Sequence, residues 1–157
     1  MKTTFAYIGK TNESYLETGM AIFEKRLRHY LPFETLLLPD VKDAGKLSAE
    51  QLKIREGELI LSKLKPDDGL ILLDERGKQY TSTQFAQQMD QWFQMPYRRL
   101  IFQVGGAFGF SDAVYERANH KLALSPMTFS HQMVRLFFLE QLYRGMTILR
   151  NEPYHNE

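Results

Sequence analysis

Short runs of β-branched and aromatic residues alternate with longer helical patterns along the whole of this chain. We expect strands at residues 4–8, 33–38, 70–73, 99–104 and 121–124, and helices at residues 13–30, 48–64, 81–93, 111–118 and 131–149. The expected N-caps are Asn12, Ser48, Thr81 or Ser82, and Ser111. This alternation is typical of a mostly parallel sheet with helices on both faces. Because no linker, repeat or low-complexity stretch interrupts it, we predict a single α/β domain over residues 1–157.

The composition excludes several classes of protein. Cysteine is absent, which removes a thiolate nucleophile, a cysteine-based zinc site and a disulfide framework, and fits a reducing compartment. The longest apolar runs, residues 36–38 and 70–73, fall far short of the roughly 20 residues that a membrane span requires. The first residues lack the pattern of a signal peptide, so we predict a cytoplasmic protein. A formal charge of +1 argues against coating nucleic acid through bulk charge but allows a local basic patch.

The last expected helix has almost no polar face. A helix that is apolar all round must be covered on all sides. A small domain offers few such places, so we predict a homodimer in which this helix meets a second copy of the chain. The alternative is a central core helix within one copy.

Three expected strands end in segments that suit a ligand site. Residues 105–109 (GGAFG) form a glycine-rich turn, residues 74–78 (DERGK) are charged, and residues 124–129 (LSPMTF) are apolar. Taken singly, the three segments have ordinary explanations: a packing turn, a solvated loop and a tucked loop, respectively. Open α/β sheets bind ligands outside the carboxyl ends of their strands, so the three together indicate a shared crevice.

The chain end carries its own candidate groups. Three of the four histidines, at positions 120, 131 and 155, lie in the last 38 residues, but their spacing matches no metal-binding motif, so we predict no metal site. Tyr154 and His155 follow the last helix, where an unstructured terminus would be usual. Glu140 and Arg144 are spaced as a local ion pair on that helix.

Six segments, taken together, resemble the RlmH (YbeA) family, a group of bacterial ribosomal RNA large-subunit methyltransferases of the SPOUT, or α/β-knot, class. The segments are residues 73–78 (LDERGK), 105–109 (GGAFG), 124–129 (LSPMTF), 131–135 (HQMVR), 140–144 (EQLYR) and 153–155 (PYH). The similarity covers the chain in order and length. One position departs from the family pattern, because Ser130 stands where the family usually has proline.

The resemblance implies both an activity and a set of site residues. The implied activity is S-adenosylmethionine-dependent methylation of N3 of a pseudouridine in 23S ribosomal RNA, within an assembled ribosome, by a homodimer whose chains carry a C-terminal trefoil knot. The implied cofactor contacts are Leu73, Gly105, Leu124, Ser125, Pro126, Met127, Thr128 and Phe129. An apolar loop suits the flat adenine ring, while backbone groups can read its polar edge.

The chemistry asks for particular side chains at the substrate. N3 of pseudouridine carries a proton at neutral pH, so its removal needs a base or a group that stabilises the anion. His155 is the first candidate for the base, with Asp74 and Glu140 as alternatives; Arg144 would stabilise charge and Tyr154 would contact the target base. The local groups expected to bind RNA are Lys25, Arg26, Arg28, His29, Arg98 and Arg99.

Two other classes of function remain open at this point. A non-catalytic RNA-binding module would keep the basic groups but would not need the glycine turn or the apolar loop. A nucleotide-dependent oxidoreductase would use a similar crevice, yet its glycine fingerprint is missing after the first strand.

Overall fold

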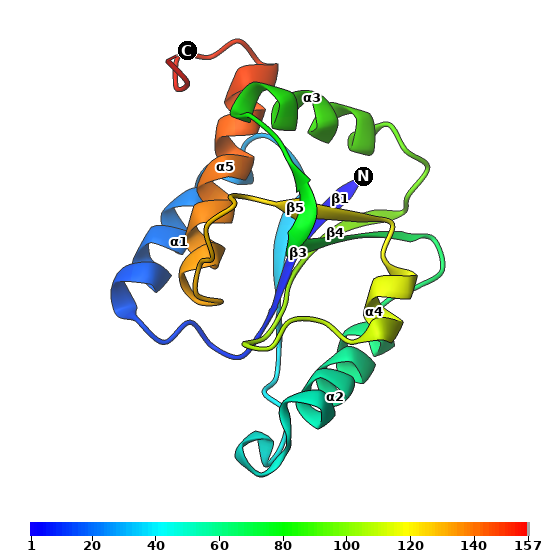
Figure 1. Cartoon of the computed structure of the whole chain (residues 1–157). Helices are drawn as coiled ribbons and strands as arrows, with labels where there is room; N and C mark the ends of the chain where they lie inside the picture. Colours follow the sequence, from blue (N-terminus) through cyan, green and yellow to red (C-terminus); the bar gives the residue numbers. More distant parts are fainter. Residues whose placement is uncertain (157) are drawn as a thin grey trace.

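The computed structural model describes residues 1–156 as five parallel strands with helices on both sides (Figure 1). The strands are β1 (Lys2–Ile8), β2 (Phe33–Leu38), β3 (Asp68–Gln79), β4 (Arg99–Val104) and β5 (His120–Ala123). Their order in the sheet is β2-β1-β4-β3-β5, and every neighbouring pair is parallel. The predicted α/β class with a parallel sheet is confirmed; the knot implied by the resemblance stays a prediction.

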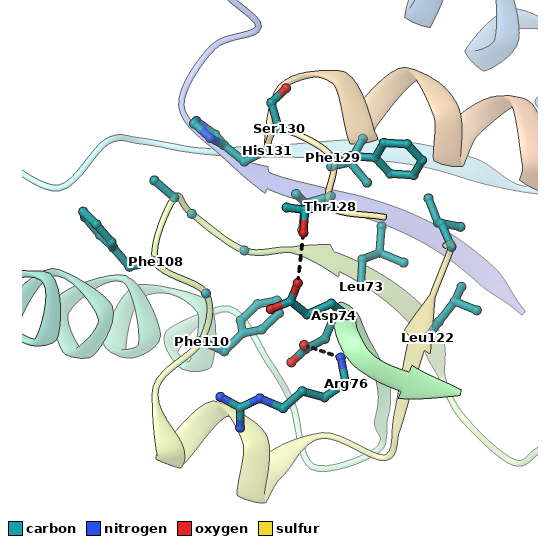
Figure 2. A pocket seen from close by; sticks show the side chains of 18 of the residues that line it. Leu73, Asp74, Arg76, Phe108, Phe110, Leu122, Thr128, Phe129, Ser130 and His131 are labelled. Carbon is teal, nitrogen blue, oxygen red and sulfur yellow. Dashed lines mark hydrogen bonds between the residues drawn. The ribbon is translucent and has the colours of Figure 1, made fainter. Parts of the chain in front are cut away.

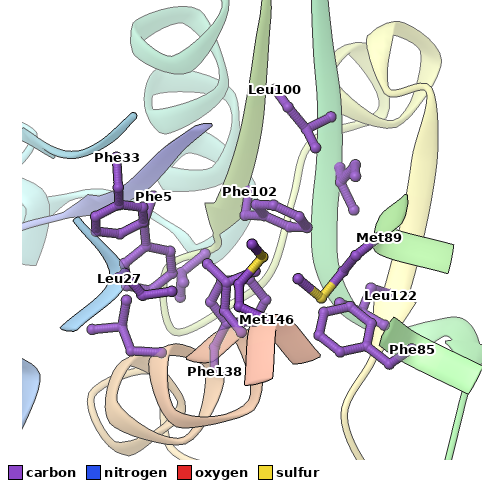
Figure 3. Packing of buried hydrophobic residues seen from close by; sticks show 14 of the residues in the cluster. Phe5, Leu27, Phe33, Phe85, Met89, Leu100, Phe102, Leu122, Phe138 and Met146 are labelled. Atoms are coloured by element: carbon purple, nitrogen blue, oxygen red, sulfur yellow. The ribbon is translucent and has the colours of Figure 1, made fainter. Parts of the chain in front are cut away.

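Five α-helices and one short 3₁₀ segment connect and cover the strands. They are α1 (Ser14–Leu27), η1 (Ala44–Lys46), α2 (Ala49–Ser62), α3 (Ser82–Phe93), α4 (Asp112–Arg117) and α5 (Met133–Leu149). One core cluster joins α1, α3 and α5 to one face of the sheet, and a second joins α2 and α4 to the other face. The larger core is centred on Phe138 of α5, whose ring lies 5.1 Å from that of Phe5 and 4.9 Å from that of Phe102 (Figure 3).

The helix starts follow the sequence closely, with one exception. Ser48 and Thr81 form capping boxes, and Ser111 caps α4 through the Val114 N–H. The predicted cap at Asn12 is wrong, since α1 starts after Glu13 and the Asn12 N–H instead donates to Gln132.

Several predicted ends shift by a few residues. Helix α1 ends at Leu27 rather than residue 30, because the chain must turn before Pro32. Helix α2 ends two residues early, and α5 begins two residues late, at Met133. The Met133 N–H donates to the Ser130 hydroxyl over 3.0 Å, so the serine that replaces the family's proline supports the start of α5.

Strand β3 differs most from its prediction. It runs from Asp68 to Gln79 instead of 70–73, and Leu73 and Lys78 both pair with Leu122 of β5. The residues between them therefore bulge out of the ladder. Gly77 permits the return, because a Cβ there would lie 2.6 Å from the Leu122 backbone nitrogen. The predicted charged loop at 74–78 is thus a bulge within a strand.

Helix α5 lies between α1 and α3 against the sheet (Figure 1). This position buries Phe138, Leu139 and Leu142 within one copy of the chain, as the core-helix alternative expected. Met133 and Phe137 remain exposed at 38% and 41%. No helix among residues 1–156 is long and apolar enough to cross a membrane.

Candidate active site

The bulge of β3 and the carboxyl ends of β4 and β5 enclose a cavity of about 560 Å³ (Figure 2). All three segments singled out in the sequence contribute to its wall. Of the predicted cofactor contacts, seven line the cavity and Pro126 does not; the seven are Leu73, Gly105, Leu124, Ser125, Met127, Thr128 and Phe129. The predicted crevice therefore exists as one site.

The glycine turn forms one side of the cavity. Gly106 and Gly109 form an isolated antiparallel bridge, and the Gly109 N–H donates to the Gly106 carbonyl over 3.2 Å. Gly109 has a φ of +84°, a conformation that L side chains rarely adopt. The Phe110 ring packs against the turn, so that a Cβ added to Gly105 would lie 3.2 Å from this ring. The turn brings bare backbone to the cavity surface.

The β3 bulge gives the cavity an acidic wall. Asp74 and Glu75 both line it, and the Asp74 carboxylate accepts the Arg76 N–H over 2.9 Å. The Thr128 hydroxyl donates to Glu75 over 3.4 Å, which joins the bulge to the apolar loop (Figure 2). Burial, with a hydrogen bond to Asp74, raises the pKa of Tyr115 to about 12, so this phenol stays neutral beside the carboxylates.

His131 lines the cavity where the chain enters α5. Burial and the nearby Arg135 cation lower the pKa of His131, so its imidazole is neutral at pH 7. Arg135 is 1% exposed. Its guanidinium donates to the Ile8 and Gly9 carbonyls over 2.8 and 2.9 Å. Arg135 therefore fixes the entry of α5 to the end of β1.

The predicted catalytic residues form a second cluster at the far end of α5. Arg144 Nη2 lies 2.6 Å from Glu140, and Arg144 Nη1 lies 3.0 Å from His155 Nδ1. The Tyr154 hydroxyl donates to Glu140 over 3.0 Å, and the Arg144 guanidinium stacks over the Tyr154 ring. Burial, followed by the Glu140 hydrogen bond, raises the pKa of Tyr154. The chain end is thus held against α5.

The two clusters do not meet within one chain. Val134 lines the cavity, whereas Arg144 lies ten residues further along the same helix, which corresponds to about 15 Å at the rise of an α-helix. Figure 1 shows the chain terminus at the opposite end of α5 from the loop that enters it. One copy therefore holds the cavity and, well apart from it, the predicted catalytic side chains.

A shallow groove of about 400 Å³ adjoins the C-terminal cluster. Its lining residues are mostly cationic or aromatic: Arg26, His29, Tyr30, Tyr143, Arg150 and Glu152. The Arg26 guanidinium lies 5.3 Å from the Tyr143 ring, and that of Arg150 lies 4.9 Å from the Tyr30 ring. Of the predicted RNA-binding cations, the structure places Arg26 and His29 here.

Lys25 and Arg28 lie at the end of α1 beside Arg26 but do not line the groove, whereas Arg98 and Arg99 are elsewhere. Arg98 and Arg99 bind the buried carboxylate of Asp68 over 3.0 and 2.9 Å, at the start of the strands and away from both clusters. This ion-pair network gives them a structural explanation. Among residues 1–156, no group of three or more histidine, aspartate or glutamate side chains could hold a metal ion.

Some site residues escaped the sequence analysis. Phe110 and Tyr115 line the cavity but resemble ordinary loop and helix residues in the sequence. The buried role of Arg135 could have been predicted from the sequence, because a single cation on an apolar stretch of helix must find hydrogen-bond partners when it is buried.

The fold and the cavity are those of a known class of α/β proteins. The family described as "Predicted SPOUT methyltransferase" matches residues 1–155. The chain belongs to this SPOUT methyltransferase family, as the resemblance in its sequence indicated.

Its relatives within the family share one description. The chain is 55% identical over 156 residues to the "Ribosomal RNA large subunit methyltransferase H" of Cytophaga hutchinsonii, covering 99% of this chain and all of the relative. It is 52% identical over 157 residues to the protein of that name from Parabacteroides distasonis, covering all of both chains. The protein of that name from Flavobacterium johnsoniae is 51% identical over 150 residues, 96% of each chain.

Proposed function

We propose that this protein is an S-adenosylmethionine-dependent methyltransferase that acts on N3 of a pseudouridine in 23S ribosomal RNA. The cavity at the bulge of β3 and the ends of β4 and β5 is the observation that carries the proposal, because seven of the eight implied cofactor contacts line it. The names of full-length relatives at about half identity support the ribosomal RNA substrate.

The cavity fits the proposed cofactor chemically. Leu73, Leu124 and Phe129 offer apolar surface for the adenine ring, and the glycine turn offers backbone groups for its polar edge. The acidic wall of Asp74 and Glu75 suits a ligand that carries a sulfonium and an ammonium group. When bound, S-adenosylmethionine supplies an electrophilic methyl group; the side chains of this protein position it and exclude water.

The C-terminal cluster suits the stabilisation of negative charge on the target base. Arg144 is always a donor, so His155 accepts its hydrogen bond at Nδ1 and, when neutral, carries its own proton at Nε2. His155 in this arrangement is a donor toward a base carbonyl rather than a proton acceptor. Arg144 and His155 would thus lower the cost of losing the N3 proton to solvent or to a carboxylate.

We propose that a homodimer completes the site. Met133 and Phe137, four residues apart on α5, expose apolar side chains, and Tyr15 and Ile22 are exposed on α1. A two-fold axis across the middle of α5 would make the two copies of this helix antiparallel. The C-terminal cluster of one copy would then lie over the cavity of its partner, which bridges the separation found within one chain.

The groove beside the C-terminal cluster supports RNA binding. Arg26 and Arg150 supply charge for phosphates, while Tyr30 and Tyr143 present ring surface, a combination that suits unpaired nucleotides. We expect a double R26A and R150A variant to raise KM for the ribosomal substrate and to flatten its salt dependence. Cofactor affinity should stay unchanged, because neither residue lines the cavity.

The deciding experiment is mass mapping of ribosomal RNA from cells with and without the active protein. Loss of one methyl group on a pseudouridine, restored by the purified protein with S-adenosylmethionine, is the expected result. Calorimetric titration with S-adenosylmethionine and with NAD separates the alternatives. Binding of NAD alone would indicate an oxidoreductase, and binding of neither would indicate a non-catalytic RNA-binding module.

A further inference from the structure

Glu56 of α2 is a buried acid that the cofactor site, as described so far, does not use. Its side chain is 8% exposed, and its Oε1 atom is buried without a hydrogen-bond partner. None of the salt bridges formed within residues 1–156 involves it. A carboxyl group in this state costs stability, because folding removes it from water without replacing its hydrogen bonds.

The carboxyl group faces the back of the glycine turn. A Cβ added to Gly106 would lie 2.5 and 2.6 Å from the two Glu56 oxygens and 2.9 Å from the carboxyl carbon. Gly106 itself lines the cavity, whereas Glu56 does not. The turn therefore separates a buried carboxyl group on one side from the proposed cofactor on the other.

The electrostatic surroundings leave backbone N–H groups as the natural partners. Asp40 is the charged group that most affects Glu56, and its negative charge adds to burial in raising the pKa of Glu56. Ser111, the N-cap of α4, packs against the neighbouring Gly57 and accepts the Val114 N–H, and no hydrogen bond joins its hydroxyl to Glu56. Gly106 has no side chain, so its backbone is what Glu56 can reach.

We propose that Glu56 is a positioning residue: with the cofactor bound, its carboxyl group accepts hydrogen bonds from backbone N–H groups of the 105–109 turn and holds that turn in the binding conformation. The inference rests on the proposed function of the cavity. It accounts for a costly acid in the core by giving the carboxyl group partners when the cofactor is bound. It also explains the glycine at position 106, because any larger residue would displace the carboxyl group.

The test compares three variants by S-adenosylmethionine calorimetry and by thermal melting. E56M removes the acceptor, E56Q keeps one acceptor oxygen, and E58M is the matched control at an exposed position of the same helix. We expect E56M to lose at least about tenfold in cofactor affinity, the typical effect of losing a hydrogen bond to a charged group. E56M should melt no lower than wild type, since it also removes a buried unpaired oxygen. E56Q and E58M should bind within about threefold of wild type.

The outcomes separate this inference from the proposed function. If wild type itself does not bind S-adenosylmethionine, the proposed function fails. If wild type binds and E56M binds equally well, the positioning role is wrong. A lower melting temperature in E56M with unchanged affinity would mean that Glu56 is only structural, and an E56Q loss equal to that of E56M would refute the acceptor role.

A double-mutant cycle tests the contact with Gly106. G106A should weaken cofactor binding in the wild-type background, because its methyl group would push against the carboxyl group. In the E56A background that space is empty, so adding G106A should cost no further affinity. Additive losses would show that the two positions act independently and would overturn the inference.

Discussion

Replacing Arg135 with methionine should destabilise the protein markedly while preserving its fold. The guanidinium lies in the core and donates to the carbonyl oxygens of Ile8 and Gly9 and to the Thr11 hydroxyl, and its Cζ atom lies 4.3 Å from the Tyr7 ring centre. Methionine fills similar volume but donates nothing. The two carbonyl groups belong to the backbone and cannot be removed, so they would remain buried without these donors.

The magnitude follows from the hydrogen bonds. Each bond from a charged donor contributes about 1.5–3 kcal/mol, and the losses are not additive within one side chain. Burial of a cation without a paired carboxylate opposes this gain, and burial is also what lowers the pKa of Arg135. We therefore expect R135M to lower the free energy of unfolding by about 3 kcal/mol, or roughly 6–12 °C in Tm for a domain of this size.

The assay is urea denaturation and thermal melting of wild type, R135M, R135K and the exposed control R55M. R135K keeps the charge but cannot form the same fork of bonds, so it should fall between wild type and R135M. R135M should also weaken S-adenosylmethionine binding, because Arg135 holds the helix entry that carries His131 into the cavity wall. A loss below about 1 kcal/mol in R135M would refute the reasoning, since it would mean that the carbonyls find other donors.

Three further predictions concern the site and the assembly. G105V should abolish S-adenosylmethionine binding while the far-UV circular dichroism stays near wild type, because the added side chain would enter the space between the turn and Phe110. Unchanged affinity in the folded variant would show that the turn is not part of the binding site. Light scattering at micromolar concentration should give twice 18.4 kDa, and F137E should yield monomers; a fully active monomer would refute the dimer. Truncation after Pro153 should leave cofactor affinity intact and lower turnover by at least about 100-fold, and full activity of the truncated protein would refute a catalytic role for the chain end. If His155 acts as a hydrogen-bond donor, H155Q should retain more activity than H155A.

A mixing experiment connects the first and third of these predictions. In a heterodimer of G105V and H155A chains, one site combines an intact cavity with an intact C-terminal cluster if the two come from different copies. Activity should therefore return when the two inactive variants are mixed and allowed to exchange. No recovery in a confirmed heterodimer would place both parts of the site in one chain.

The sequence by itself determined the local structure and the parts of the proposed cofactor site. Caps at Ser48, Thr81 and Ser111 start their helices as predicted, because a capping side chain acts on backbone groups only three residues away. Strand ends followed by a glycine turn and an apolar loop indicated one crevice, since parallel strands deliver their carboxyl ends to the same edge. The family resemblance named seven of the residues that line it.

Only the tertiary structure decided how these parts are arranged. The return of β3 to Leu122, the burial of Glu56 behind the glycine turn and the distance between the cavity and His155 all depend on contacts between residues far apart in the chain. Sequence patterns report which face of a helix or strand is apolar, but not which neighbour covers it. A glutamate on an amphipathic helix and a histidine near the chain end therefore acquire their roles only when the sheet order brings particular backbone and side-chain groups against them.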